Sequence, residues 1–294
     1  MALELLYATP LAFTFRPISP QFSLFHLQNR PSETWVTVVS GSPAARAPSP
    51  AIESPYMLTL ALDTCDARGS VALLRDSTVL ASAPHDCPDD YSIWLLPAVD
   101  RILAAARVRL TDIDLFAVAA GPGSFTGVRA GLTTVKAWVE VFGRPAVAVS
   151  RLEALAEQAP PASELVAAFV DARREQLFAA LFQRDANGFA LVGEQSLLSP
   201  QDLLESVAQQ ADGRPIAWVS LDPQALIRAP AWSARASLGE SVLPADPVLA
   251  PVIARLALRA AARGRSVGAL ALDANYLRRP DAELFWKGSA AHGK

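Results

Sequence analysis

The chain of 294 residues has few of the side chains that bind metal ions or form disulfides. Its two cysteines, Cys65 and Cys87, exclude a disulfide-rich scaffold and favour a reducing compartment, so we expect a cytoplasmic protein. Its three histidines, His26, His85 and His292, lie too far apart in sequence to pair on one helix, so we expect no metal site. The longest apolar runs are too short to cross a bilayer, and we expect no membrane contact.

Charge of either sign is also scarce. Charged residues make up 19% of the chain and hydrophobic residues 51%, which predicts a globular protein and not a disordered one. The 26 lysines and arginines are balanced by 29 aspartates and glutamates, for a formal net charge of −3. Without an excess of positive charge, this chain alone is expected to bind nucleic acid weakly.

Residues 1–56 differ from the rest of the chain in composition. They hold eight prolines and seven serines, and the stretch 43–50 is typical of a linker. Met57 stands directly before a clean strand pattern at 58–63. We therefore predict that residues 1–56 are a disordered arm or a mis-assigned extension upstream of a start at Met57, and composition leaves both alternatives open.

The remaining residues alternate between strand and helix patterns. Strands are predicted at 58–63, 69–74, 78–82, 115–120 and 146–150, and helices at 91–107, from the glycine-rich turn to 142, and at 151–158. The order is typical of an α/β domain in which a hairpin flanks a mixed sheet. We assign residues 57–160 to a first lobe.

The second half of the chain begins in the same way as the first. An apolar strand at 165–171 ends in Asp171, as the strand at 58–63 ends in Asp63. An Ala-Leu pair follows each aspartate at the same spacing. The repeated order predicts two duplicated, ribonuclease-H-like lobes of the actin/Hsp70/sugar-kinase architecture, with residues 161–294 forming a divergent second lobe.

The glycine-rich stretch 121–127 joins a buried strand to a helix. Glycines permit close backbone approach, and free N–H groups at a helix start attract anions, so a phosphate or nucleotide cradle is one interpretation. A tight turn that needs glycine for its geometry is the other. Asp63 and Asp171 also have two interpretations. Each could hold a metal or water near phosphate, or each could cap the turn that follows its strand. The candidate cradle consists of Asp63, Gly121, Gly123, Ser124, Thr126, Gly127 and Arg129.

Two helices carry more apolar surface than a sheet needs. The helix at 91–107 has two apolar stripes, and the helix that ends at 142 has a second face containing Trp138. This surplus predicts a surface for a partner's helices, although packing inside the chain is the open alternative. The predicted interface consists of Leu95, Leu96, Val99, Ile102, Leu103, Val128, Gly131, Leu132, Val135, Trp138, Val139 and Phe142.

A set of motifs resembles the bacterial TsaB family, also called YeaZ. The motifs are Leu60-Ala-Leu-Asp-Thr64, Gly69-Ser-Val-Ala-Leu73, Gly121-Pro-Gly-Ser-Phe-Thr-Gly-Val-Arg129, Gly131-Leu, Val149-Ser-x-Leu-Glu-Ala-Leu155 and Asp171-Ala-Arg-Arg174. The likeness runs from Met57 to Arg174 and weakens from Phe189 onward. Tyr91 stands where many relatives have histidine, and Ala274 replaces a proline in the C-terminal pattern.

The resemblance implies a non-catalytic subunit in tRNA modification. It implies that the chain dimerises with and activates TsaD, which forms N6-threonylcarbamoyladenosine at position 37 of ANN-decoding tRNAs. It further implies an ATPase partner, TsaE, and tRNA contact through the complex, and it leaves a homodimer open. No cofactor is implied for this chain, and weak binding of ATP or ADP is left open.

Two enzyme hypotheses compete with this scaffold. One is an autonomous nucleotide hydrolase that uses Asp63, Asp171 and the glycine-rich stretch. The other is a peptidase of the M22 type. The HxxxH metal motif that TsaD carries is absent from this sequence, which argues against the peptidase.

Overall fold

The computed structural model describes residues 15–19, 22–27, 36–40, 56–87 and 89–277. The chain divides into two units, Met1–Ser54 and Pro55–Lys294. The described part of the first unit is an antiparallel sheet of three strands, none of which the sequence analysis predicts. They are β1 (Phe15–Ser19), β2 (Phe22–Leu27) and β3 (Val36–Ser40). The prediction of a disordered or mis-assigned extension over 1–56 otherwise falls outside the described residues.

The second unit begins with a five-stranded mixed sheet. Its order is β6-β5-β4-β7-β8, with β4 at the centre, antiparallel to β5 and parallel to β7. Every residue of β4 and β7 is buried, because helices cover both faces of the sheet. The strands are β4 (Leu58–Asp63), β5 (Ser70–Arg75), β6 (Thr78–Pro84), β7 (Leu115–Ala119) and β8 (Ala146–Val149).

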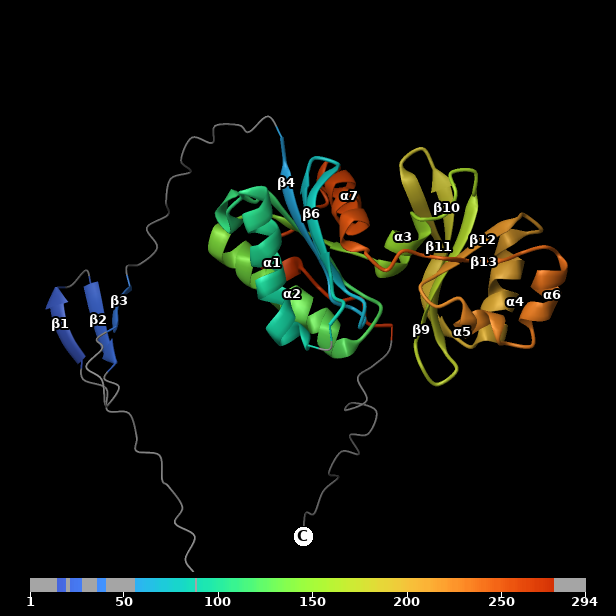
Figure 1. Cartoon of the computed structure of the whole chain (residues 1–294), viewed down its shortest axis with the longest axis horizontal. Helices are drawn as coiled ribbons and strands as arrows, with labels where there is room; N and C mark the ends of the chain where they lie inside the picture. The colour runs from blue at the N-terminus through green and yellow to red at the C-terminus, as the bar shows by residue number, and fades with distance from the viewer. Residues whose placement is uncertain (1–14, 20–21, 28–35, 41–55, 88, 278–294) are drawn as a thin grey trace, which may run out of the picture. The chain divides into compact units, whose positions relative to one another are not determined.

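Two long helices cover one face of this sheet. They are α1 (Tyr91–Ala106) and α2 (Phe125–Phe142), and a short 3-10 turn, η1 (Leu110–Asp112), leads from α1 into β7. Helix α7 (Ala250–Ala261) covers the opposite face (Figure 1). The Trp138 ring of α2 packs on Phe116 of β7, with 5.4 Å between ring centroids.

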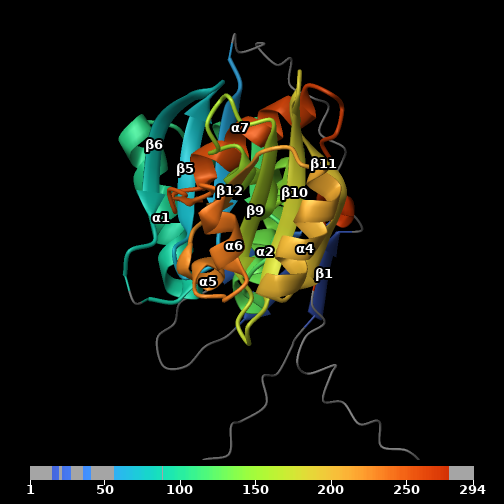
Figure 2. The same cartoon turned by 90° about the vertical axis from the view of Figure 1, so that its right-hand side faces the viewer.

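A second five-stranded sheet repeats the first. Its order is β11-β10-β9-β12-β13. If the strands of each sheet are numbered along the chain, both sheets have the order 3-2-1-4-5. Helix α3 packs on one face (Figure 1), and α4 lies on the other together with the short α5 and α6 (Figure 2). The elements are α3 (Arg151–Ala156), β9 (Leu165–Asp171), β10 (Leu177–Asp185), β11 (Gly188–Leu198), α4 (Pro200–Ala211), β12 (Ile216–Ser220), α5 (Gln224–Ile227), α6 (Trp232–Ser237) and β13 (Val242–Pro244). The predicted duplication of an α/β fold is confirmed.

The equal spacing of the Ala-Leu pairs in the two halves predicts equal strand register, and this prediction is wrong by one residue. Ala72 pairs with Ala61, two positions before Asp63, whereas Ala180 pairs with Ala168, three positions before Asp171. The loop that follows β4 is one residue longer than the loop that follows β9, so equal spacing in sequence gives unequal pairing.

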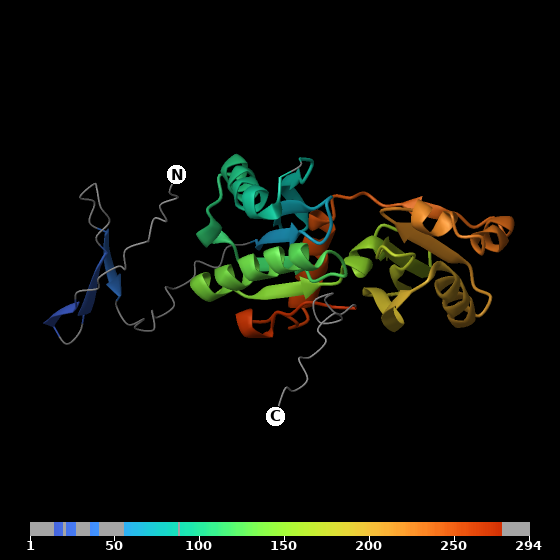
Figure 3. The same cartoon turned by 90° about the horizontal axis from the view of Figure 1, so that it is seen from below.

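The last described elements, from α7 onward, pack on the first sheet and not on the second. Helix α7 contacts β4, β5, β7 and β8. The 3-10 turn η2 (Ala269–Ala271), drawn in red in Figure 3, contacts α2. Val267 pairs with Ala146 of β8. The predicted second lobe, 161–294, therefore includes residues that complete the first lobe. Helices α3 and α7 contact each other and share one apolar core with both sheets.

Candidate functional site

The parallel strands of both sheets end at a cleft between the two lobes. Its volume is about 580 Å³, and its walls come from both lobes. Among the described residues, three arginines and three aspartates line it, so the formal charges of these six cancel. They are Asp66, Arg68, Arg151, Asp171, Arg173 and Asp222. The Nη1 of Arg68 donates to the Leu221 carbonyl at 3.0 Å and so joins the first lobe to the second.

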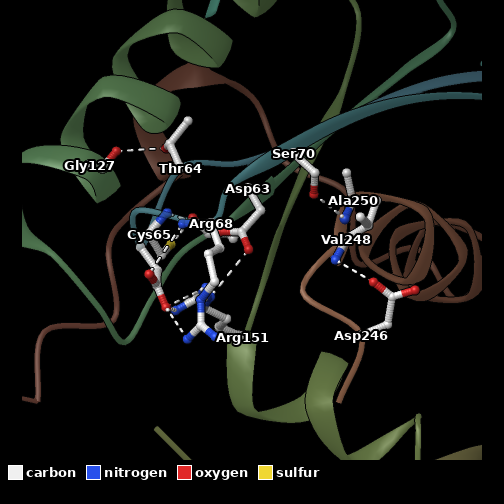
Figure 4. Close-up of polar contacts among 12 residues, drawn as sticks. Asp63, Thr64, Cys65, Arg68, Ser70, Gly127, Arg151, Asp246, Val248 and Ala250 are labelled. Carbon is white, nitrogen blue, oxygen red and sulfur yellow. Dashed lines mark hydrogen bonds and ion pairs between the residues drawn. The ribbon is translucent and has the colours of Figure 1, made fainter. Parts of the chain in front are cut away.

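A buried ion pair closes the end of β4. Nε of Arg151 donates to Oδ2 of Asp63 at 3.2 Å, and the two side chains are 1% and 0% exposed (Figure 4). Asp66 lies 3.2 Å from the same guanidinium. Burial would lower the pKa of Arg151, but Asp63 and Asp66 outweigh it and raise that pKa. Burial likewise acts to raise the pKa of Asp66, and Arg151 overcomes it and lowers that pKa.

The glycines of the 121–127 stretch are packed against the chain itself. A Cβ atom on Gly127 would clash with the Thr64 carbonyl, and one on Gly123 would clash with the Cys65 carbonyl. The Thr64 hydroxyl donates to the Gly127 carbonyl at 2.7 Å (Figure 4). Ser124 caps α2, since its Oγ accepts from the Gly127 N–H at 3.4 Å. Close packing of β4 against α2 therefore accounts for these glycines without a ligand.

The structure brings together only part of the predicted cradle. Gly123 and Ser124 line the cleft beside Asp66, while Asp63 is sealed behind Arg151. Gly121 is buried at positive φ, and Thr126 and Arg129 are exposed on α2 outside the cleft lining. Asp171 lines the cleft, where its carboxylate accepts from the Arg173 N–H at 2.7 Å.

Sequence reasoning missed Arg151, which decides the chemistry at Asp63. It occupies the variable position of the Val149-Ser-x-Leu-Glu motif, so no residue pattern marked it. Its neighbour Ser150 caps α3 by accepting from the Glu153 N–H at 3.4 Å. Arg151 is the first residue of α3 and follows the capping Ser150 at the end of β8. This position directs its side chain toward β4, which only the fold shows.

Tyr91 begins α1 and fixes the loop that carries Asp66. Its hydroxyl donates to the Asp66 carbonyl, and its ring lies 4.6 Å from His85 and 5.9 Å from Trp94, between centroids. Burial, and then the nearby Asp63, raise the pKa of Tyr91. The first residue of α1 is thus a phenol that keeps its proton.

Most residues of the predicted interface lie in the chain's own core. Only Leu96 is exposed, at 53%, and Phe142 is half-buried. The other predicted residues are buried: Leu95, Val99, Ile102, Leu103, Val128, Gly131, Leu132, Val135, Trp138 and Val139. Each helix has a second apolar stripe because it packs over a wide face, both on the sheet and on neighbouring elements. Exposed apolar side chains nevertheless remain on the outer side, namely Ile93 at 63% and Val141 at 74%.

Similar proteins place this geometry in a family. A family model described as "TsaD: tRNA N6-adenosine threonylcarbamoyltransferase" matches residues 79–221. The tRNA threonylcarbamoyladenosine biosynthesis protein TsaB of Escherichia coli K12 is 32% identical over 243 residues, which cover 79% of this chain and 97% of that protein. The chain belongs to the TsaB family. It therefore has a role in the biosynthesis of threonylcarbamoyladenosine in tRNA.

Other TsaB proteins and a solved structure agree. The Bacillus subtilis TsaB is 37% identical over 127 residues, or 43% of this chain and 56% of that protein. YeaZ from Pseudomonas aeruginosa superposes with a TM-score of 0.59 at 27% identity, and the match covers 75% of this chain and all of that one. These likenesses support the two-lobed architecture predicted from the repeated order of elements.

Two further observations concern the described residues alone. None of their helices is both long and apolar enough to cross a membrane. Within 56–87 and 89–277, no three histidine, cysteine, aspartate or glutamate side chains gather in a way that could hold a metal ion.

Proposed function

We propose that this TsaB-family chain is a non-catalytic subunit that docks onto the catalytic subunit TsaD and activates it. In this proposal the pair works with the ATPase TsaE and forms N6-threonylcarbamoyladenosine at position 37 of ANN-decoding tRNAs. The observation that carries the proposal is the outer face of α1 and α2, where large apolar side chains are exposed to solvent.

The docking surface is defined by exposed residues of both helices. It consists of Ile93, Leu96 and Ala104 on α1 with Ala137 and Val141 on α2. Both helices lie side by side on the same face of the first sheet, opposite α7 (Figure 1). Small residues between larger ones allow helices of a partner to approach closely, as in a helical bundle. A second copy of the chain would compete for the same surface.

Autonomous nucleotide hydrolysis finds less support. Asp63 is held in a buried pair with Arg151, so it is not free to position a metal or water near phosphate. Gly123 and Gly127 have their open side filled by the chain. The described residues that line the cleft include equal numbers of arginines and aspartates, which give little attraction for a polyphosphate. We accordingly propose that the chain needs no cofactor of its own.

A binding experiment tests the docking surface. The purified full chain and TsaD are mixed, and the dissociation constant is measured by calorimetry, with size-exclusion chromatography for the complex. Leu96→Glu should weaken binding by at least about 100-fold, because it places a charge in an apolar contact. The matched control is Leu238→Glu, which alters a leucine of the second lobe that is 73% exposed.

The outcomes decide between the hypotheses. Equal loss in both variants, or no loss in Leu96→Glu, would contradict docking through α1 and α2. Formation of the modified nucleoside, or rapid ATP turnover, by the chain without TsaD would overturn the non-catalytic role. Sedimentation of the chain alone, at the same concentrations, measures the competing homodimer.

A further inference from the structure

An arginine is held in a fixed orientation at the start of α2. The guanidinium carbon of Arg129 lies 3.6 Å from the ring centroid of Phe125, one turn earlier on the same helix. Its Nε donates to the Tyr276 hydroxyl at 3.3 Å. The two aromatic rings lie 5.0 Å apart, with 36° between their planes. Two contacts from different segments thus fix a side chain that usually rotates freely.

This arginine has no negative partner in the described part of the chain. The ion pairs found there join other arginines to carboxylates. The first turn of α2 contains no acidic residue. A cation near a helix N-terminus is unfavourable, because the helix dipole is positive at that end. Arg129 therefore adds its positive charge to the positive end of the α2 dipole, which makes the electrostatic potential there more positive.

The guanidinium belongs to the outer face of the helix and not to the cleft. Phe125 and Tyr276 line the cleft, but Arg129 does not. Arg129 is exposed, as are Thr133 and Ala137 at the following helical turns, and Ala137 belongs to the docking surface. Helices α1 and α2 follow β6 and β7, which run parallel to β4. The N-termini of both helices therefore lie near the carboxyl ends of these strands. Arg129 thus lies toward the N-terminal end of α2, on the exposed side of the helix that continues through Thr133 to Ala137 of the docking surface.

We propose that Arg129 is a preformed receptor for a carboxylate of the partner subunit that covers α1 and α2. Because its Nε is engaged by Tyr276, the two terminal nitrogens remain to donate side by side, which matches the two oxygens of an aspartate or glutamate. Fixing the arginine in advance reduces the entropy lost when the partner binds. This inference rests on the proposed function, since it identifies a contact within the same docking surface.

The test measures the dissociation constant of the full chain with TsaD at several salt concentrations. Arg129→Gln should weaken binding by at least about tenfold at low salt, because a charge-assisted pair at the interface is lost. It should also flatten the salt dependence relative to the natural chain. Arg129→Lys should recover only part of the affinity, since an ammonium cannot donate in a planar pair. The matched control is Arg228→Gln, an exposed arginine of the second lobe.

Tyr276→Phe separates positioning from charge. It removes the oxygen that accepts from Arg129 and keeps the ring on Phe125. We expect a smaller loss of affinity than for Arg129→Gln, with the salt dependence retained. A loss as large as that of Arg129→Gln with a flattened salt dependence would contradict the division of roles.

Each remaining outcome has one meaning. Binding of Arg129→Gln within twofold of the natural chain overturns the receptor while docking through Leu96 still stands. If Arg129→Gln leaves TsaD binding intact but weakens the binding of tRNA or ATP by the complex, the anion is a phosphate and the carboxylate proposal is wrong. Absence of any binding by the natural chain would instead overturn the proposed function.

Discussion

Arg151 and Asp63 form an ion pair that is almost fully withdrawn from water and joins the first residue of α3 to the last residue of β4. The pair stands where a two-lobed fold would otherwise present a free carboxylate to its cleft. Asp66 adds a second negative charge on the same arginine. The carboxylate at the end of β4 therefore holds the first lobe to α3, the helix that leads into the second lobe.

Breaking this pair should cost much of the stability. Arg151→Met leaves Asp63 buried without a counter-charge, and the free energy of unfolding should fall by about 3–5 kcal/mol. Urea denaturation followed by circular dichroism measures this. Arg173→Met, which removes an arginine whose side chain is 87% exposed in its pair with Asp171, should cost at most about 1 kcal/mol.

The double variant Asp63→Leu with Arg151→Met sharpens that test. Removing both charges eliminates the uncompensated carboxylate, so much of the loss should be recovered. If the double variant is less stable than Arg151→Met alone, Asp63 stabilises the fold through another contact, such as the hydrogen bond that it accepts from the Cys65 N–H at 2.9 Å.

Stability should depend on pH through Glu153. Burial, and then the nearby Glu157, raise its pKa above the ordinary value. A raised pKa in the folded state means that stability present at low pH is lost as pH rises through that pKa. Glu153→Gln should therefore stabilise the chain at pH 7, and the gain should vanish below about pH 4. Thermal unfolding across this range is the measurement, and a gain that persists at pH 3 would refute the electrostatic cause.

The contact between α2 and the end of β4 should tolerate no added methyl group. Gly127→Ala would push a Cβ into the Thr64 carbonyl, and since backbone cannot rotate away we expect a loss of about 1–3 kcal/mol or more. Gly268→Ala is the control, because an added Cβ there meets nothing within 4 Å. Comparable melting temperatures for the two variants would show that α2 shifts to make room.

Trp138 should behave as a core residue in the absence of any partner. It is 9% exposed and packs on Phe116, so Trp138→Ala should lower the unfolding free energy by about 3–5 kcal/mol. Ile93→Ser, at a side chain 63% exposed, should change stability by no more than about 0.5 kcal/mol. Denaturation of the isolated chain measures this. Unchanged stability of the Trp138→Ala variant would mean that this face of α2 contacts a partner and not the core.

Periodicity predicted the elements that have long apolar patterns. The strand at 58–63 and the helix at 91–107 agree with β4 and α1 to within a residue. Helix α2 begins at Phe125, inside the stretch read as a turn, because Ser124 caps it there. Short α6 and the three-residue β13 were missed, since their burial comes from the second lobe's own core and not from a repeating pattern.

The site was less predictable than the fold. An apolar stripe shows that a residue is buried but not what buries it, so Leu132 and Trp138 were assigned to a partner when the sheet and neighbouring elements cover them. Arg151 and Tyr276 act through contacts with residues 88 and 147 positions away, a separation at which spacing carries no information. The glycine-rich stretch left a phosphate cradle and a tight turn open, and only the fold shows that the chain itself occupies the space beside Gly123 and Gly127.

The return of α7 to the first sheet makes that lobe discontinuous along the chain. Ala250 N–H donates to the Ser70 hydroxyl at 3.0 Å, so the helix attaches to β5 across 180 residues (Figure 4). During synthesis, β4, β5 and β7 leave the ribosome long before the helix that covers them. The second lobe, from β9 to β13, is contiguous and can close on itself earlier. We therefore expect the first-made sheet to be the last to finish folding, and a fragment that ends at residue 160 to expose one apolar face of it.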